Sequence, residues 1–77
     1  MFFMNYPSVE ITLGVLTKAG WFALESRITT PDGWGWQVFV SRGEHDLVGE
    51  GARREQAWWE ALKRARMLDS LSRFPPP

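Results

Sequence analysis

Polar and apolar residues alternate along four short stretches of the first fifty residues, a pattern typical of half-buried β-strands. The stretches are residues 9–15, 21–29, 34–41 and 47–50, and they contain many β-branched and aromatic side chains. Turn-forming residues separate them. The strongest turn is Thr30-Pro31-Asp32-Gly33, because proline fixes φ and Asp-Gly closes the turn. The pattern predicts an antiparallel meander of four strands.

The first stretch has a second interpretation as a helix. Val9, Leu13, Leu16 and Gly20 also line up at helical spacing. The β-branched content and Gly14 favour the strand, in which case residues 17–20 form a hairpin turn with a positive φ at Gly20. The helical alternative would change the order of elements from ββββα to αβββα.

Residues 52–72 carry the pattern of an amphipathic helix. Good helix formers dominate this segment, and its apolar residues recur at spacings of three and four. These residues are Ala57, Trp58, Ala61, Leu62, Ala65 and Leu68. The prolines at 75–77 cannot continue the helix.

The predicted fold is therefore a single α+β domain spanning residues 1–77. It comprises an N-terminal arm (1–7), an antiparallel four-stranded sheet (8–51), one helix packed on a face of that sheet (52–72) and a proline-rich tail (73–77). This is the ββββα arrangement, with αβββα as the alternative.

Composition excludes several kinds of site. The chain of 77 residues has no cysteine and one histidine, so it can form neither a disulfide nor a thiolate nucleophile nor a four-ligand structural zinc site. We expect no metal and no cofactor. No apolar run approaches the roughly 20 residues of a membrane span, and the first residues lack the basic region of a signal peptide. The expected location is the cytoplasm.

The net charge is zero, but the two halves of the chain differ in sign. Residues 1–51 hold three basic and six acidic side chains, a net charge of −3, and residues 52–77 hold six basic and three acidic ones, a net charge of +3. A neutral total argues against simple polyanion binding, which usually shows a basic excess. A basic helix beside an acidic sheet remains a clue to a partner.

Residues 36–68 resemble the C-terminal half of a double-stranded-RNA-binding domain. The similarity lies in Trp36-Gln37-Val38-Phe39-Val40, in Gly49-Glu50-Gly51, in Arg53-Arg54, and in the alanines at 57, 61 and 65. With an initial helix it would extend from Pro7 to about Leu68. The resemblance implies that the basic pair at the helix start reaches phosphates across a groove. The chain departs from the family in having Glu55 at the last basic position and two tryptophans within the alanine ladder.

Ser41, His45 and Asp46 are the only nearby residues of the types that form a catalytic triad. A triad needs a base within hydrogen-bond reach of the hydroxyl and an acid on the far ring nitrogen. Neighbouring residues of one exposed turn cannot hold that geometry, so we expect no catalytic residues and no enzyme.

Arginines and tryptophans supply the candidate contact residues. Arg53 and Arg54 begin the helix against the preference for acidic residues there, which suggests a binding role. Of five tryptophans, Trp58 and Trp36 are expected in the core. Some of the other three are expected to be partly exposed, and exposed tryptophan beside arginine is typical of interface hot spots. The predicted partner-binding residues are Arg53, Arg54, Trp59, Lys63 and Arg66 on the helix, with Trp21 and Trp34 on the sheet.

These features predict a small non-enzymatic module that binds a protein by occupying its surface. Compact, cysteine-free chains of this kind resemble accessory proteins of phages and mobile elements, including the anti-CRISPR inhibitors, in size and style. The alternative is a nucleic-acid-binding module that uses the basic helix. Either function is compatible with a homodimer formed through strand edges or the aromatic sheet face.

Overall fold

The computed structural model describes residues 6–72, and the side chains of residues 6–70. One helix precedes and one helix follows a run of three strands. The elements are α1 (Val9–Lys18), β1 (Phe22–Thr30), β2 (Gly33–Arg42), β3 (His45–Gly51) and α2 (Arg54–Ser72). Most of the expected N-terminal arm and the expected tail at residues 73–77 lie outside the described residues.

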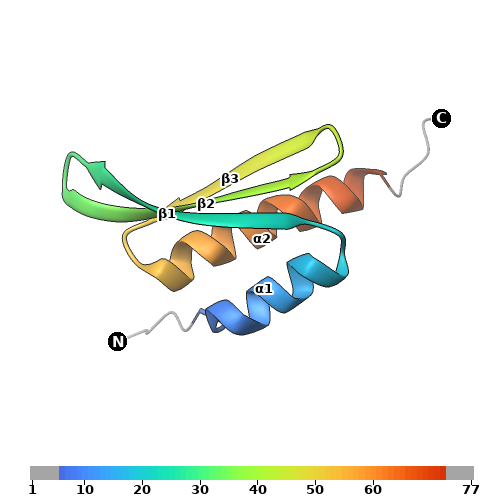
Figure 1. Ribbon diagram of the computed structural model, residues 1–77, viewed down its shortest axis with the longest axis horizontal. Helices are drawn as coiled ribbons and strands as arrows, with labels where there is room; N and C mark the ends of the chain where they lie inside the picture. Colours follow the sequence, from blue (N-terminus) through green and yellow to red (C-terminus); the bar gives the residue numbers. More distant parts are fainter. Residues whose placement is uncertain (1–5, 73–77) are drawn as a thin grey trace.

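The strands form one antiparallel sheet in the order β1-β2-β3, and both helices lie on the same side of it (Figure 1). The α+β class and the antiparallel meander are confirmed. The four-stranded ββββα prediction is wrong, because residues 9–18 form a helix; the observed order is the αβββα alternative.

Both ends of α1 are defined by local hydrogen bonds. At the start, the Ser8 hydroxyl accepts a bond of 3.2 Å from the backbone N–H of Ile11, as an N-cap does. At the end, Trp21 N–H donates to Leu16 O at 2.9 Å and Gly20 N–H to Thr17 O at 3.0 Å. This is the Schellman pattern, which needs the positive φ of 87° that Gly20 adopts. Residues 17–20 thus end a helix and do not form the predicted hairpin turn.

Packing completes the explanation of α1. Thr12 and Leu16 lie at helical spacing and are fully buried, and Val9 and Val15 pack against the same core. The intrinsic cost of a β-branched residue in a helix is only about 0.5 kcal/mol, whereas burying a leucine contributes about 2 kcal/mol. Burial and the two caps therefore outweigh the β-branched content that favours a strand.

The main core lies between α2 and the sheet. Ala57, Ala61 and Ala65 are buried against a sheet whose Val38 and Val40 are fully buried. Small side chains on α2 let the helix axis approach the strands closely, and Gly49 of β3 lies directly beneath the backbone of Ala57 and Ala61. The alanine ladder seen in the sequence is thus the contact surface of α2.

Arg42, at the end of β2, connects the sheet to both helices. Its guanidinium carbon lies 4.3 Å from the centroid of the Trp21 ring, and Nη1 donates to Ala19 O at 2.9 Å. The same guanidinium forms an ion pair with Asp69 of α2. One side chain thereby joins β2, the turn after α1 and the last part of α2.

Within residues 6–72, neither helix combines the length and the apolar content that crossing a bilayer requires.

Candidate partner-binding surface

The sheet has one face covered by helices and one open face. Register pairs across the three strands place Leu24 beside Phe39 and Phe39 beside Val48, so these three side chains form a row on the same face. The neighbouring positions Ala23, Val40 and Leu47 form a row on the opposite face, where they pack against the core. The Leu24 row therefore lies on the face that neither helix covers.

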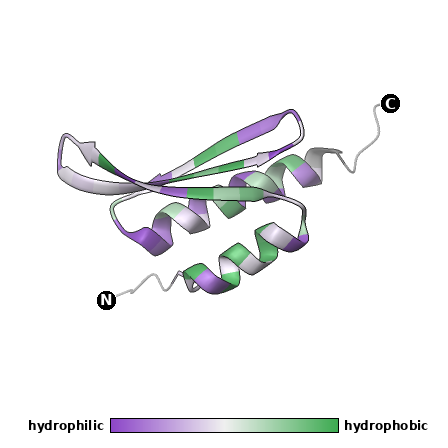
Figure 2. Cartoon of the chain, viewed as in Figure 1, coloured by the Kyte–Doolittle hydropathy of each residue, from purple (hydrophilic) through white to green (hydrophobic). Residues whose placement is uncertain are grey.

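This open face is apolar at its β1 side. Phe22 is 63% exposed and Leu24 55% exposed, and Phe39 and Val48 are half-buried beside them. Figure 2 shows the hydrophobic colour on the half of β1 that begins at Phe22. We call Phe22, Leu24, Phe39 and Val48 the open-face patch. Large exposed side chains that touch one another are typical of a protein-binding surface.

Acidic side chains border the patch along β3. Asp46 is the register partner of Ser41, and Glu50 is the partner of Gln37, which places both carboxylates on the open face. Both residues are exposed. The open face thus has an apolar side on β1 and β2 and a negatively charged side on β3.

The sequence pattern separates the two faces of β1 but does not say which is covered. Trp21, one of the predicted contact residues, is only 3% exposed and lies beneath Arg42. Phe22 is exposed in its place. Trp21 is therefore a core residue that offers no surface to a partner.

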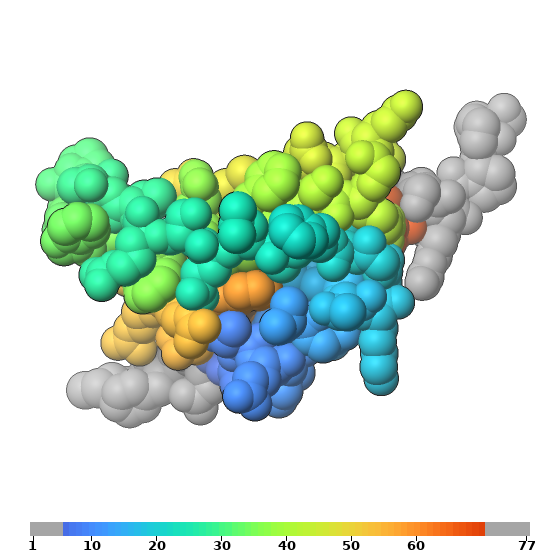
Figure 3. Space-filling model, viewed as in Figure 1, coloured from blue at the N-terminus to red at the C-terminus, as the bar shows by residue number. Residues whose placement is uncertain are grey.

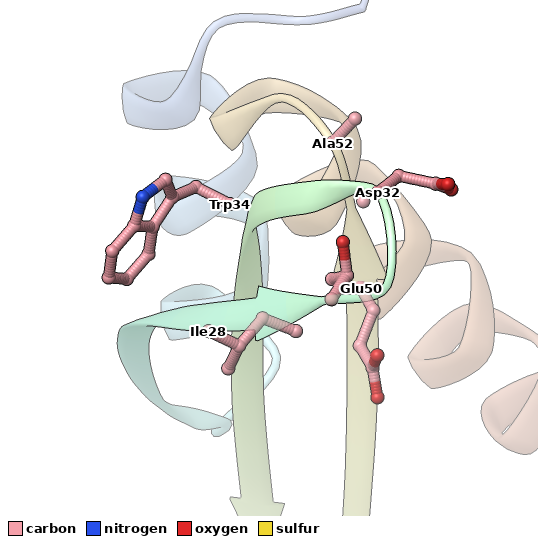
Figure 4. A pocket seen from close by; sticks show the side chains of 7 residues that line it. Ile28, Asp32, Trp34, Glu50 and Ala52 are labelled. Atoms are coloured by element: carbon pink, nitrogen blue, oxygen red, sulfur yellow. The ribbon is translucent and has the colours of Figure 1, made fainter.

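The β1–β2 hairpin carries a second exposed aromatic group. Trp34 is 67% exposed, and the guanidinium carbon of Arg27 lies 5.3 Å from its ring centroid and 5.1 Å from that of Trp36. Such distances allow a cation–π interaction with each ring. Trp34, Ile28 and Glu50 all border a hollow at this end of the sheet, and in Figure 4 the Trp34 ring points away from the other two side chains. The expectation that some of these tryptophans are exposed is confirmed at Trp34.

The predicted residues of α2 do not form one surface. Arg53, Lys63 and Arg66 are exposed, whereas Trp59 is only partly exposed and packs against the core. At about 100° per residue, Trp59, Lys63 and Arg66 share the side of α2 that faces away from the sheet. Arg54 turns the other way and forms an ion pair with Glu25 of β1. The predicted set is thus divided between the outer side of α2, the start of α2 and the hairpin.

Glu25 is the polar centre of the covered face. Its Oε1 accepts a bond of 2.8 Å from Trp58 Nε1 and a second bond from Arg54 Nε. Burial beneath the sheet opposes ionisation and raises the pKa of Glu25. The hydrogen bonds from Arg54 and Trp58 and the charge of Arg54 act in the opposite direction and outweigh it, so the pKa lies below its ordinary value. The Glu25–Arg54 pair also neutralises part of the charge difference between the sheet and the helix.

The lowered pKa predicts a pH-dependent effect of Glu25→Gln. A carboxylate with a lower pKa in the folded state stabilises the protein above its unfolded pKa and loses this contribution as the pH falls through the folded pKa. The variant should therefore be less stable than wild type by about 1 kcal/mol at pH 7, and the difference should shrink in acid. Urea unfolding at several pH values measures both effects.

Glu44→Gln, in the exposed β2–β3 turn, is the matched control for this experiment. It should change the free energy of unfolding by less than about 0.5 kcal/mol. A difference between wild type and Glu25→Gln that stays constant on acidification would contradict the assigned role of Glu25.

Ser41, His45 and Asp46 do not come together as a catalytic triad would. Ser41 and Asp46 are register partners on the open face, whereas His45 precedes Asp46 and lies on the opposite face of β3. Within residues 6–72, no group of three His, Cys, Asp or Glu side chains is placed to hold a metal ion.

Neither models of known protein families, nor curated proteins, nor solved structures give a significant match to this chain.

Proposed function

We propose that this chain is a non-enzymatic protein-binding module whose contact surface is the open-face patch. The observation that carries the proposal is the exposure of Phe22 and Leu24 on a sheet face that neither helix covers. Aromatic and large aliphatic side chains at the centre of an interface supply most of its binding energy, because they leave water on binding. The partner would be a protein of the cytoplasm.

The charges around the patch indicate the chemistry of the partner. Asp46 and Glu50 border the apolar side chains on β3, and both are exposed. A complementary surface would present an apolar centre with lysine or arginine along one side, since complementary charges orient a partner and speed its association. The small cysteine-free format supports the role of an accessory protein of a phage or mobile element, such as an anti-CRISPR-like inhibitor.

Paired substitutions on the open face test this function. Phe22→Ser with Leu24→Ser removes the two most exposed members of the patch, and it should raise the Kd for a captured partner by about a hundredfold, because two hot-spot residues are lost. The partner is captured from the source cells with the wild-type protein and identified by mass spectrometry. Titration calorimetry then measures Kd for the purified partner and each variant.

Ile11→Ser with Met67→Ser is the matched control. These residues lie on α1 and α2 and are about as exposed as Phe22 and Leu24, so the control removes a similar apolar area away from the sheet. It should leave Kd within about threefold of wild type. A partner that is lost by the control and kept by the sheet variant would place the contact on the helices and refute the proposal.

Nucleic-acid binding is the second candidate function. It is favoured by the αβββα order, under which the resemblance to a double-stranded-RNA-binding domain extends over residues 7–68, and by the exposed Arg53 at the start of α2. Such binding should weaken steeply as salt rises, because neutralising phosphates releases counterions. A salt titration against duplex RNA, duplex DNA and single strands tests it, and an affinity that is absent at low salt would remove this candidate.

A further inference from the structure

We infer that two copies of this chain pair antiparallel along β1, forming a six-stranded sheet with a two-fold axis at Ser26. The surface involved is the outer backbone edge of β1, which shares only Phe22 and Leu24 with the open-face patch. The inference is argued from that edge and does not depend on the proposed function. The edge itself, the order of residues along it and the position of α1 each point to this arrangement.

β1 is an edge strand that lacks most of the usual protection against pairing. It is nine residues long, it contains neither proline nor lysine, and its register with β2 runs one to one without a bulge. Short strands, prolines, lysines, bulges and inward-pointing charges are the common means of blocking an exposed edge. Of these β1 has only the inward-pointing charges, Glu25 and Arg27. Figure 3 shows the side chains of β1 along the near side of the molecule, with α1 below them and no other described segment in front. Among residues 6–72, β2 is the only strand that pairs with β1, so the outer edge is free to accept another strand.

The sequence of β1 is complementary to itself about Ser26. In an antiparallel pair centred on this residue, Glu25 lies opposite the partner's Arg27, and Arg27 lies opposite the partner's Glu25. On the other face, Leu24 lies opposite the partner's Ile28. Cross-strand pairs of opposite charge and of apolar side chains both stabilise a sheet. The partner strand that this edge matches is therefore β1 of a second copy of the chain.

Glu25 can accept the additional bond. Trp58 and Arg54 both donate to Oε1, so Oε2 is the oxygen that would receive the guanidinium of the partner's Arg27. Arg27 is exposed and lies on the same face of β1 as Glu25. Its guanidinium lies over the Trp34 and Trp36 rings in the single chain and would turn outward to reach the partner's Glu25. A carboxylate can accept several hydrogen bonds at once, so the dimer contact adds to the internal contacts of Glu25.

The residues of β1 that direct their N–H and C=O groups outward are the ones that this axis requires. The Thr30–Gly33 pair closes the hairpin across a two-residue loop, and such a loop is closed by a hydrogen-bonded pair. Hydrogen-bonded and non-hydrogen-bonded pairs alternate along the ladder, so Ser26 bonds to β2 while Glu25 and Arg27 direct their N–H and C=O groups outward. In the dimer, Ser26 forms a close non-hydrogen-bonded pair with its counterpart, flanked by two hydrogen-bonded pairs.

The helices of the two copies would interleave. α1 lies beneath the half of β1 that begins at Phe22, whereas the hairpin half projects past the helices (Figure 1). A two-fold axis at Ser26 places the partner's α1 beneath this projecting half, on the side where Trp34 is exposed. The dimer thereby covers the part of the sheet that the chain's own helices leave bare.

Ser26→Cys tests the register directly, because the chain has no other cysteine. In the inferred dimer the two substituted positions face each other at a separation of about 4.5 Å between Cα atoms, which suits a disulfide. Mild oxidation should therefore convert most of this variant to a covalent dimer. Thr29→Cys, three residues along the same strand, is the control: its two copies would be about 20 Å apart and should remain largely free of the cross-link. Equal cross-linking of both variants, or none of Ser26→Cys, would overturn the inference.

Arg27→Glu provides a second test that needs no cross-link. It replaces both attractive Glu25–Arg27 pairs across the axis with pairs of like charge, and it should weaken dimerisation of the otherwise unmodified chain about tenfold or more. Arg66→Glu, on the outer side of α2, makes the same change in net charge and should leave dimerisation unchanged. Sedimentation equilibrium over a concentration series measures all three proteins. A monomeric wild type, or equal effects of the two substitutions, would refute pairing through β1.

Discussion

Replacing Gly49 with alanine should lower the free energy of unfolding by about 3 kcal/mol or more. A Cβ on Gly49 would lie 2.3 Å from the backbone N of Ala61, 2.4 Å from the carbonyl oxygen of Ala57 and 2.8 Å from the Cα of Ala61. These are backbone atoms of a helix, so they cannot rotate away as a side chain could. The whole of α2 would have to rise from the sheet. Urea denaturation followed by tryptophan fluorescence measures the loss.

Gly14→Ala is the matched control for this substitution. Gly14 lies in α1, and beyond its own helical backbone and chain neighbours a Cβ there meets nothing within 4 Å. Because alanine restricts the unfolded chain and favours helix, the control should stabilise the protein by up to about 1 kcal/mol. A domain of this length has a total stability of about 4 to 12 kcal/mol, so the two glycine variants should be well separated. If Gly49→Ala unfolded within about 1 kcal/mol of wild type, the close contact of α2 with β3 would be refuted.

The elements that the sequence predicts correctly are those in which local pattern and burial agree. The alternation in residues 34–41 and the spacing of Ala57, Ala61 and Ala65 each match one period, and they appear as β2 and α2. Residues 9–18 fit both the two-residue period of a strand and the 3.6-residue period of a helix. The capping signals that decide between them are Ser8, three residues before the N–H that it caps, and Gly20, between the apolar pair Leu16 and Trp21. Those signals are visible in the sequence, and weighing them above β-branched content would have favoured the helix.

The open-face patch could not be predicted in the same way. Alternation along residues 21–29 shows that Phe22 and Trp21 point to opposite faces. The Phe22 face is the more apolar of the two in the sequence, yet it is the one that the helices leave uncovered. Which one is covered depends on where α1 and α2 pack, and this is fixed by contacts between residues far apart in the chain. Arg42 covering Trp21 and Trp58 bonding to Glu25 are two such contacts. Charge counts fail for the same reason, since Arg54 and Glu25 fall in opposite halves of the sequence and neutralise each other in the fold.

Leu16→Ala should be the second strongly destabilising substitution, lowering the free energy of unfolding by about 3 kcal/mol. Leu16 is fully buried and belongs to the core cluster that joins α1 to α2 and the sheet. It also borders a hollow of about 120 Å³ between α1 and α2, so the truncation enlarges an existing void. Trp21 borders the same hollow, so the truncation also removes apolar surface next to the residue that follows the end of α1. Urea denaturation measures the overall loss, and hydrogen exchange should show the amides of α1 opening first.

Leu13→Ala is the matched control, because it makes the same leucine-to-alanine change on α1 at a position outside the core. Leu13 lies on the same helix and undergoes the same truncation, but its side chain is partly exposed, so little apolar area is lost and alanine is the better helix former. The expected change is less than about 1 kcal/mol. If the two variants unfolded at the same urea concentration, Leu16 would not be the residue that holds α1 to the core. If Leu16→Ala alone were destabilised, with faster exchange confined to α1, the helix would be shown to depend on packing beyond its own caps. That dependence is the physical reason why its sequence, read locally, also fits a strand.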